Sequence, residues 1–443
     1  MVAVNVKIIE ELKCFLTLIL SNPEVKEICF ERKEDFTRDR KIGFSETVLL
    51  MMNMIKRSLK IEIQDFLDYG LVKKINYTKM AFILQRKKIK PIVFEAWNQL
   101  LVDCFYHYYG NRVKRWNGFL LIGVDGSTAY LPSNPETESH YGVQINQFRT
   151  IPMARVMKFY DVLNNITIFS KIAPLKSSEQ TIVYNHIEQI PSDSISIYDR
   201  GFPSYSLMYL LNNQESICHF VMRAKVDFNL EVQAFVNSNQ IDTTLNLYAT
   251  DKAIKTLKLY GYSVFKNTSI KVRMIKVVLN TGETEVLLTN LYNQKEFKAS
   301  CFKELYFKRW GIETSISFDK NTTQLEEFSG QSIKSIEQDF QVTTFVLNLQ
   351  SLLEKQCERL LVEKNKGRKL EYKINKNVSV GSMKYRIVKL FTAKNPRKIL
   401  SELQKLFIES VEPIRPGRSA PRDFRTIKRK GKHKTLSNYK RAV

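Results

Sequence analysis

The feature that most constrains the fold of this chain is a pair of short strand-like segments, each of which runs into an aspartate. Residues 119–124 lead into Asp125-Gly126-Ser127, and residues 194–198 lead into Asp199-Arg200-Gly201. The first segment is an apolar run and the second alternates serine with isoleucine; both patterns, when turn residues follow, are typical of β-strands. Since Asp-Gly and Asp-Arg-Gly are also ordinary turn sequences, neither motif identifies a site when it is taken alone.

The segments around these two strands predict a mixed α/β domain. Strands are expected over residues 155–163 and 166–172, with Asn164 and Asn165 as the turn between them. A helix over residues 179–190 precedes the strand at 194–198, and another strand is expected at 218–223. Three consecutive strands, a helix and a further strand make an antiparallel meander that leads into a parallel pair.

The rest of the chain divides into regions of different periodicity. Apolar residues recur at helical spacing in three N-terminal segments and again further on, at residues 4–20, 48–59, 91–108 and 301–364. Short alternating segments predict strands at residues 256–265, 271–279 and 285–291. We therefore expect a helical N-terminal region (1–115), the first part of an α/β core (116–225), a β-rich insertion (226–298), the second part of the core (299–365), and a basic C-terminal region with an arm (366–443).

The net charge indicates a polyanionic partner. The chain has 69 Lys and Arg residues against 45 Asp and Glu residues, a formal net charge of +24. An excess of this size favours a nucleic acid or an anionic membrane surface. The apolar runs are far shorter than the ~18 residues of a membrane-spanning helix, and the N-terminus does not have the pattern of a secretion signal. We therefore expect a cytoplasmic protein that binds nucleic acid and no membrane.

One N-terminal segment combines positive charge with apolar residues. Residues 72–94 contain no acidic residue, and their cations alternate with aromatic and aliphatic side chains. A basic face on an amphipathic helix suits contact with a phosphate backbone, although the same pattern is equally typical of a solvated helix face. The DNA-binding candidates in this segment are Lys73, Lys74, Arg86, Lys87 and Lys88.

A second charged pattern lies at residues 306–320. On a helix that advances about 100° per residue, four polar side chains fall within roughly one sixth of the circumference; they are Tyr306, Arg309, Glu313 and Lys320. Arg309 and Glu313 form an i,i+4 pair, which most often belongs to a salt-bridged helix face. The functional alternative is that the cations and the phenol contact phosphates while the carboxylate binds a metal ion.

This spacing resembles the Tyr-Arg-Glu-Lys signature of the DDE transposases of bacterial insertion sequences, in the insertion-sequence-four family. The resemblance covers about residue 36 to the C-terminus, and the spaced signature is its most specific part. Shorter motifs similar to that family lie at Asp125-Gly126-Ser127, Asp199-Arg200-Gly201-Phe202, Leu287-Leu288-Thr289-Asn290-Leu291, Phe328-Ser329-Gly330, Gln338-Asp339-Phe340, Arg415-Pro416-Gly417-Arg418 and Tyr439-Lys440-Arg441-Ala442.

The resemblance implies a ribonuclease-H-like fold with a metal site. In it Asp125 and Asp199 end neighbouring strands, Glu313 comes from a later helix, and the three catalytic carboxylates hold two Mg²⁺ ions, for which Mn²⁺ can substitute. Two ions ~3.5–4 Å apart need oxygen ligands that leave positions open for water and the scissile phosphate. Tyr306, Arg309 and Lys320 are then expected to contact phosphates of the transposon end.

The resemblance also implies a reaction and its partners. The reaction is cleavage at the ends of an insertion sequence, followed by attack of the freed 3′-hydroxyl on DNA. The implied partners are double-stranded DNA, as terminal inverted repeats and as target, and a second copy of the chain when two ends are synapsed. The expected location is the bacterial nucleoid. Two alternatives are a catalytically silent DNA-binding protein derived from a transposase and a nuclease on the same fold.

One departure from the family concerns the insertion. Better-described members stack a flipped base on a tryptophan there, whereas the three tryptophans of this chain lie outside it, at positions 97, 116 and 310. Because stacking tolerates any aromatic face, another aromatic side chain of the insertion would have to serve. The candidates are Tyr248, Tyr260, Tyr262 and Phe265.

The C-terminal arm gives a prediction from the sequence alone. From Arg415 onward the chain has eleven Lys and Arg residues and one acidic residue, Asp423. Removing this arm should weaken binding to DNA of any sequence and flatten the plot of log affinity against log salt, because its cations neutralise several phosphates. An unchanged slope together with lost solubility or assembly would mean instead that the arm docks on the protein.

Overall fold

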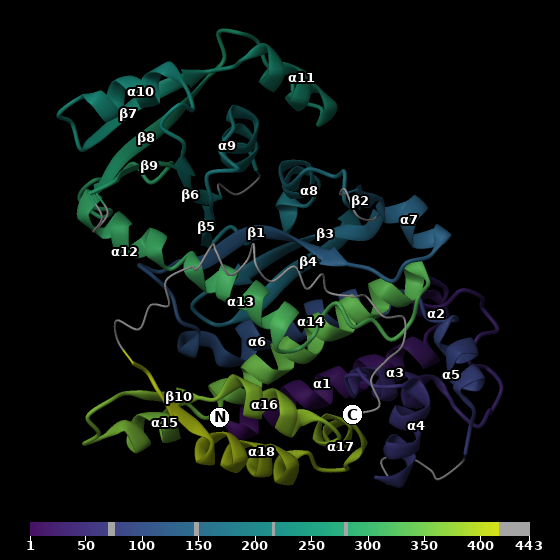
Figure 1. The fold of residues 1–443 in the computed structure, drawn as a ribbon. Coiled ribbons are helices and arrows are strands. Elements are labelled where there is room, and N and C mark those ends of the chain that lie inside the picture. Colours follow the sequence, from purple (N-terminus) through teal and green to yellow (C-terminus); the bar gives the residue numbers. More distant parts are fainter. Residues whose placement is uncertain (70–75, 146–149, 215–217, 279–281, 416–443) are drawn as a thin grey trace. The chain divides into compact units, whose positions relative to one another are not determined.

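The computed structural model describes residues 1–69, 76–145, 150–214, 218–278 and 282–415. The chain forms two compact units, which are described separately below (Figure 1). Unit 1 consists of residues 1–110, 129–154 and 319–443, and unit 2 consists of residues 111–128 and 155–318. Among the described residues, no helix is both long and apolar enough to cross a membrane.

Unit 2 is built on a mixed β-sheet. The strand order is β2-β3-β1-β5-β6-β9-β8-β7, and β4 pairs with β3. Strands β1 and β3 continue into unit 1, where β3 pairs with β2. The strands are β1 (Leu120–Tyr130), β2 (Val143–Ile145), β3 (Thr150–Asp161), β4 (Ile166–Pro174), β5 (Ser194–Tyr198), β6 (His219–Ala224), β7 (Asp242–Tyr248), β8 (Ser269–Val278) and β9 (Thr284–Thr289).

The helices of unit 2 connect these strands and cover the sheet. Phe302 and Leu305 of α12 are fully buried against Leu121, Ile197 and Leu287 of the sheet. The helices are α8 (Glu179–Asn185), α9 (Tyr205–Asn212), α10 (Leu230–Asn237), α11 (Asp251–Leu259), α12 (Phe302–Phe307) and α13 (Trp310–Asn321), the last of which ends in unit 1.

The mixed α/β class is confirmed, and the sheet pairs the two strands that lead into the aspartates. Strands β3, β4, β5 and β6 lie where the sequence predicts them, to within a few residues at their ends. Strand β5 pairs in parallel with β1 on one side and with β6 on the other. Strand β6 then pairs antiparallel with β9, so β7, β8 and β9 extend the same sheet.

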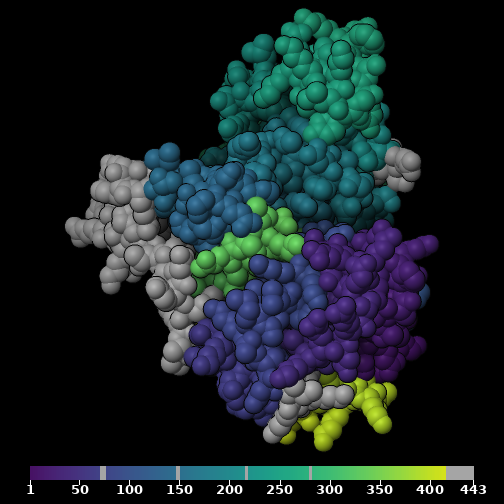
Figure 2. Space-filling view, turned by 90° about the vertical axis from the view of Figure 1, so that its right-hand side faces the viewer, coloured from purple at the N-terminus to yellow at the C-terminus, as the bar shows by residue number. Residues whose placement is uncertain are grey.

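The strand predicted at residues 256–265 is wrong, because helix α11 continues to Leu259. The Thr250 side chain accepts a hydrogen bond from the backbone N–H of Ala253 and so caps α11. Ala253 and Leu257, four residues apart, are both buried by this helix. The space-filling view shows the teal and green atoms from α10 to β9 packed into one continuous body (Figure 2).

Two further expectations about local structure need correction. Strand β1 does not end at Asp125 but continues to Tyr130, although its pairing with β5 stops at Val124. Residues 306–320 do not form one regular helix, because a tight turn at Lys308 and Arg309 separates α12 from α13. The backbone N–H of Arg309 donates to the carbonyl of Tyr306 at 3.0 Å, a three-residue spacing typical of a 3₁₀ turn.

Unit 1 is mainly helical and packs around the long helix α14. Trp97 of α6 stacks on Phe345 of α14 with 4.1 Å between ring centroids, and its indole N–H donates to the carbonyl of Leu12 in α1. The elements are α1 (Val2–Ser21), α2 (Pro23–Cys29), α3 (Phe44–Met52), α4 (Leu59–Asp68), α5 (Lys79–Arg86), α6 (Ile92–Tyr109), α7 (Pro135–Tyr141), α14 (Ile333–Lys355), α15 (Glu358–Asn365), α16 (Lys376–Met383), α17 (Arg386–Thr392), α18 (Arg397–Glu409), and a hairpin of β10 (Tyr372–Ile374) and β11 (Val411–Pro413).

Arg86 is a buried structural residue, so the prediction that it lies on an exposed basic face, free to contact a phosphate backbone, is wrong. Its guanidinium donates to the Gln338 and Ser329 side chains, to the Ser335 carbonyl, and to the Asp339 carboxylate at 2.8 Å. Only 5% of Arg86 is exposed. These bonds attach α5 to α14.

The other basic candidates in this segment differ in their surroundings. Lys87 is exposed, while Lys88 lies 3.8 Å from the Asp35 carboxylate and over the ring of Phe36. Lys73 and Lys74 lie outside the described residues.

The contrast between Arg86 and Lys87 gives a stability prediction. Arg86→Met leaves the Asp339 carboxylate without its buried partner, and should lower the free energy of unfolding by ~3–5 kcal/mol. Lys87→Met, at the exposed neighbouring position, should change it by less than about 0.5 kcal/mol. Chemical denaturation of both variants tests this, and equal stability of the two would contradict the structural role of Arg86.

Candidate active site

Asp125 and Asp199 lie next to each other because of the register of two parallel strands. Val124 of β1 pairs with Tyr198 of β5, and each aspartate is the next residue along its chain. Asp125 accepts a hydrogen bond from the Gly126 N–H at 2.8 Å. Asp199 begins a turn in which its carbonyl accepts from the Phe202 N–H at 3.0 Å.

Glu313 reaches this edge of the sheet because α13 packs closely on β1. A Cβ built on Gly123 would lie 3.0 Å from Ile312 of α13, which is already a tight contact, so only glycine fits easily there. The Lys158 ammonium on β3 donates to the Ser315 hydroxyl on α13 at 2.6 Å. Together these contacts hold the first turn of α13, with Glu313 in it, against the sheet.

Arg309 connects two of the three carboxylates. Its guanidinium donates to Glu313 Oε1 at 2.5 Å and lies 3.9 Å from Asp125 Oδ2. It is 4% exposed and lies over the rings of Tyr306 and Trp310, at 5.6 and 5.4 Å from their centroids. A nearly buried guanidinium so placed reduces the repulsion between two carboxylates that share a small volume.

Asp199 has a different set of partners. The Arg223 guanidinium on β6 lies 3.3 Å from Asp199 Oδ1, and it also pairs with Glu285 on β9 at 2.5 Å. The Tyr306 hydroxyl lies 3.5 Å from the same aspartate oxygen. Burial raises the pKa of the Tyr306 phenol, so it is a neutral O–H donor at physiological pH.

Sequence reasoning missed a fourth carboxylate, Glu179. A Cβ built on Gly126 would lie 2.5 Å from Glu179 Oε1, so this carboxylate occupies the space beside the residue after Asp125. Arg155 pairs with Glu179 at 3.0 Å. A glutamate in the first turn of a helix is ordinary, and no sequence signal distinguishes this one. Arg223 and Glu285, also missed, had one signal, since each is a charged residue next to apolar residues of a predicted strand.

The site residues expected from the sequence are thus only partly brought together. Asp125, Asp199, Glu313, Tyr306 and Arg309 form one charged cluster in unit 2 through the contacts above. Lys320 lies in the last turn of α13, within unit 1, and its ammonium is 3.3 Å from Glu326.

The cluster has the chemistry of a divalent-cation site but not the geometry of a formed one. Among the described residues, no group of three His, Cys, Asp or Glu side chains lies close enough to hold a metal ion. Between Asp125 and Glu313 the arginine provides the positive charge. Carboxylate oxygens are the ligands that Mg²⁺ prefers. Burial raises the pKa of Asp125 to about 6, so a cation beside it would stabilise its charged form.

Two of the four aromatic candidates of the insertion line a cavity of unit 2. Tyr248 and Tyr260 contribute to a cavity of about 790 Å³, together with Tyr184 and Tyr205. Tyr262 packs against Tyr209 with 5.5 Å between ring centroids, and Phe265 is 68% exposed.

One known protein family matches the sequence of this chain. The transposase DDE domain matches residues 117–349, which is more than half of the chain and contains all three carboxylates. The chain belongs to this family of DDE transposases, as the spaced signature in its sequence predicts.

Curated relatives point to the same type of transposase. The chain is 21% identical over 238 residues to "Transposase InsG for insertion sequence element IS4" of Escherichia coli K12, an alignment that covers 53% of this chain and 52% of that protein. It is 26% identical over 112 residues to "Putative transposase InsZ" of the same organism, covering 25% of this chain and 38% of that one. The chain thus spans about half or less of the length of these relatives.

A solved structure was also found to be similar. It is the cryo-EM structure of the piggyBac transposase synaptic complex with hairpin DNA, with a TM-score of 0.40 and 10% identity. The similarity covers 97% of this chain and 88% of that chain.

The raised pKa of Asp125 predicts a pH-dependent gain in stability for Asp125→Asn in metal-free protein. The pKa of Asp125 in the folded protein, about 6, lies above the ordinary value of 3.8. Below pH 3.8 the carboxyl group is protonated in both the folded and the unfolded protein, so it does not lower stability there. Above about pH 6 it is charged in both states, and the full loss of stability is present. The variant should therefore be more stable than the parent by up to about 3 kcal/mol near neutral pH, and equally stable near pH 4.

Chemical denaturation at both pH values measures this effect. The matched control is Asp227→Asn, an exposed aspartate of the same unit, which should change stability by less than about 0.5 kcal/mol. A loss of stability in Asp125→Asn, or a gain independent of pH, would contradict the assignment of a buried, poorly compensated carboxylate.

Proposed function

We propose that this protein is an active transposase that cleaves DNA at the ends of an insertion sequence and joins the freed ends to target DNA. The observation that carries the proposal is the parallel register of β1 and β5, which brings Asp125 beside Asp199. Glu313 is linked to Asp125 through Arg309, in the part of the chain that matches the DDE domain. A ribonuclease-H-like core with a β-rich insertion belongs to the same proposal.

The three carboxylates would hold two divalent ions, Mg²⁺ with Mn²⁺ able to substitute. When bound, such ions stabilise the charge on a phosphate and lower the pKa of a bound water. The Arg309 guanidinium bonds to Glu313 Oε1, so Glu313 would bind a metal ion through Oε2 or release the arginine, whose guanidinium could then contact a phosphate oxygen. The neutral Tyr306 hydroxyl, which lies 3.5 Å from an Asp199 oxygen in the free protein, would donate to a phosphate when DNA is bound.

The partners in this proposal are double-stranded DNA and a second copy of the chain. The DNA includes the terminal inverted repeats and the target, and Tyr306, Arg309 and Lys320 would contact phosphates near the cut. The net charge of +24 supports a polyanionic substrate. Synapsis of two ends would bring two copies together at the bacterial nucleoid.

The proposal predicts that Glu313→Gln abolishes Mg²⁺-dependent nicking while DNA binding is retained. The amide has the shape of the carboxylate but lacks the charge that holds a metal ion, and metal catalysis contributes several kcal/mol. A loss of roughly 10³-fold or more in nicking rate is therefore expected. The substrate is a duplex that carries the inverted repeats flanking the gene, incubated with and without Mg²⁺.

The matched control is Glu304→Gln. Glu304 is an exposed glutamate on the neighbouring helix α12, paired only at the surface with Lys308, and its replacement should leave nicking unchanged. Full nicking by Glu313→Gln would show that another carboxylate is essential. Cutting without preference for the repeats would identify a nuclease, and binding without any cutting by the parent protein would identify a silent DNA-binding protein.

A further inference from the structure

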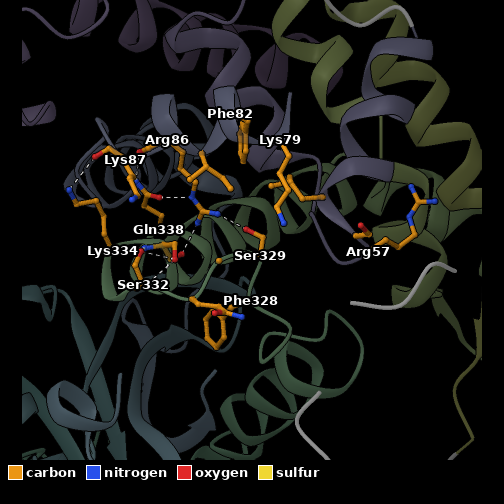
Figure 3. Close-up of a pocket in the computed structure, with 16 residues that line it drawn as sticks. Arg57, Lys79, Phe82, Arg86, Lys87, Phe328, Ser329, Ser332, Lys334 and Gln338 are labelled. Atoms are coloured by element: carbon orange, nitrogen blue, oxygen red, sulfur yellow. Dashed lines mark hydrogen bonds between the residues drawn. The ribbon is translucent and has the colours of Figure 1, made fainter. Parts of the chain in front are cut away.

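A cavity of unit 1 is lined by cationic residues and by no acidic residue. It has a volume of about 540 Å³ and lies between α5, the loop 328–332 and the start of α14 (Figure 3). Its lining includes five cationic residues and no aspartate or glutamate; the cations are Arg57, Lys79, Arg86, Lys87 and Lys334. The apolar part of the lining includes Leu59, Phe82, Ile83 and Phe328.

Three of these cations are already paired with acids outside the lining. Arg57 bonds to Glu62 and Asp65 of α4. Arg86 bonds to Asp339 at 2.8 Å, and Figure 3 shows it in the middle of the group with bonds to Gln338 and Ser329. The Lys334 ammonium lies 2.7 Å from Glu31, and it also donates to the carbonyl of Lys87. These pairs fix the walls of the cavity.

Lys79 and Lys87 are the two cations left for a ligand. Both are exposed, and within the described parts of the chain neither has an ion pair with a carboxylate. Lys79 is the first residue of α5 and Lys87 directly follows its last residue. Eight residues of helix separate them by about 12 Å along the axis. That distance equals three to four nucleotide steps measured along the axis of a DNA duplex, at about 3.4 Å per step.

The size of the cavity argues against a single small ion as its occupant. Its volume lies within the ~300–1,000 Å³ typical of sites for drug-sized molecules. The loop wall lies close to α14, since a Cβ built on Gly330 would be 2.5 Å from the Ser335 hydroxyl. A sugar-phosphate segment combines negative charge for the lysines with apolar sugar faces for the rest of the lining.

We propose that this cavity binds phosphates of the backbone of duplex DNA, through Lys79 and Lys87, as a site in addition to the carboxylate cluster of unit 2. The choice of DNA as the source of the phosphate rests on the proposed function. The phosphate chemistry rests on the cavity and its lysines. Free nucleotides share that chemistry, and the experiment below distinguishes them.

The test compares Lys79→Ala/Lys87→Ala with a control, Lys60→Ala/Lys398→Ala, in the full chain. Lys60 and Lys398 are exposed lysines of unit 1 outside the cavity, so both variants lose the same charge. Affinity for a fluorescent duplex of arbitrary sequence is measured in EDTA from about 50 to 200 mM salt. The slope of log affinity against log salt should become shallower by about 1.8 in the cavity variant, for two lost phosphate contacts, and stay unchanged in the control.

A second measurement needs no variant. Acetylation of lysines in the parent protein is followed by mass spectrometry, alone, with duplex DNA, and with ATP as the free nucleotide. The duplex should protect Lys79 and Lys87 more than Lys60 and Lys398. Equal slopes in the two variants, no selective protection, or protection by ATP but not by the duplex would each overturn the proposal. Because no divalent ion is present, these outcomes are independent of whether Glu313→Gln abolishes nicking.

Discussion

The site depends above all on the parallel pairing of β1 with β5. The carboxyl ends of parallel neighbours meet at the same edge of a sheet, and here the last paired residues are Val124 and Tyr198. Asp125 and Asp199 therefore become neighbours although 74 residues separate them. A shift of the register by one residue would turn one aspartate to the other face of the sheet.

Each carboxylate in this small volume has an arginine beside it. Arg309 pairs with Asp125 and Glu313, Arg223 pairs with Asp199, and Arg155 pairs with Glu179. Partly buried carboxylates repel one another, so these cations stabilise the cluster when no metal ion is bound. In the proposed function, divalent ions compete with an arginine for the same oxygens. Metal binding and the position of Arg309 are then coupled.

Positive charge has two different roles in unit 1. The buried guanidinium of Arg86 attaches α5 to α14 and fixes the loop that contains Ser329. The exposed ammonium groups of Lys79 and Lys87, at the two ends of the same helix, remain at the surface of the cavity. An arginine can satisfy five donors within a protein interior, whereas a lysine at the surface stays hydrated and mobile. Neighbouring cations in one basic segment thus differ in function because they differ in burial.

The sequence by itself determined the parts of this protein that depend on local periodicity. Strands β5 and β6 and helices α1 and α6 follow from apolar spacing, and the spaced Tyr306–Lys320 signature identifies the family. Local patterns were insufficient where a single contact decides between a helix and a strand. The Thr250 cap, for example, begins helix α11, which covers part of a predicted strand.

Only the tertiary structure decided which charges meet. Arg86 finds Asp339 at a separation of 253 residues, and Asp199 finds Arg223 only because β5 pairs with β6. Strand register and helix packing determine these ion pairs, because they bring together residues that are far apart in the sequence and that no local pattern relates. The sequence therefore proposed the three carboxylates as candidates, while the fold decided which cations lie beside them.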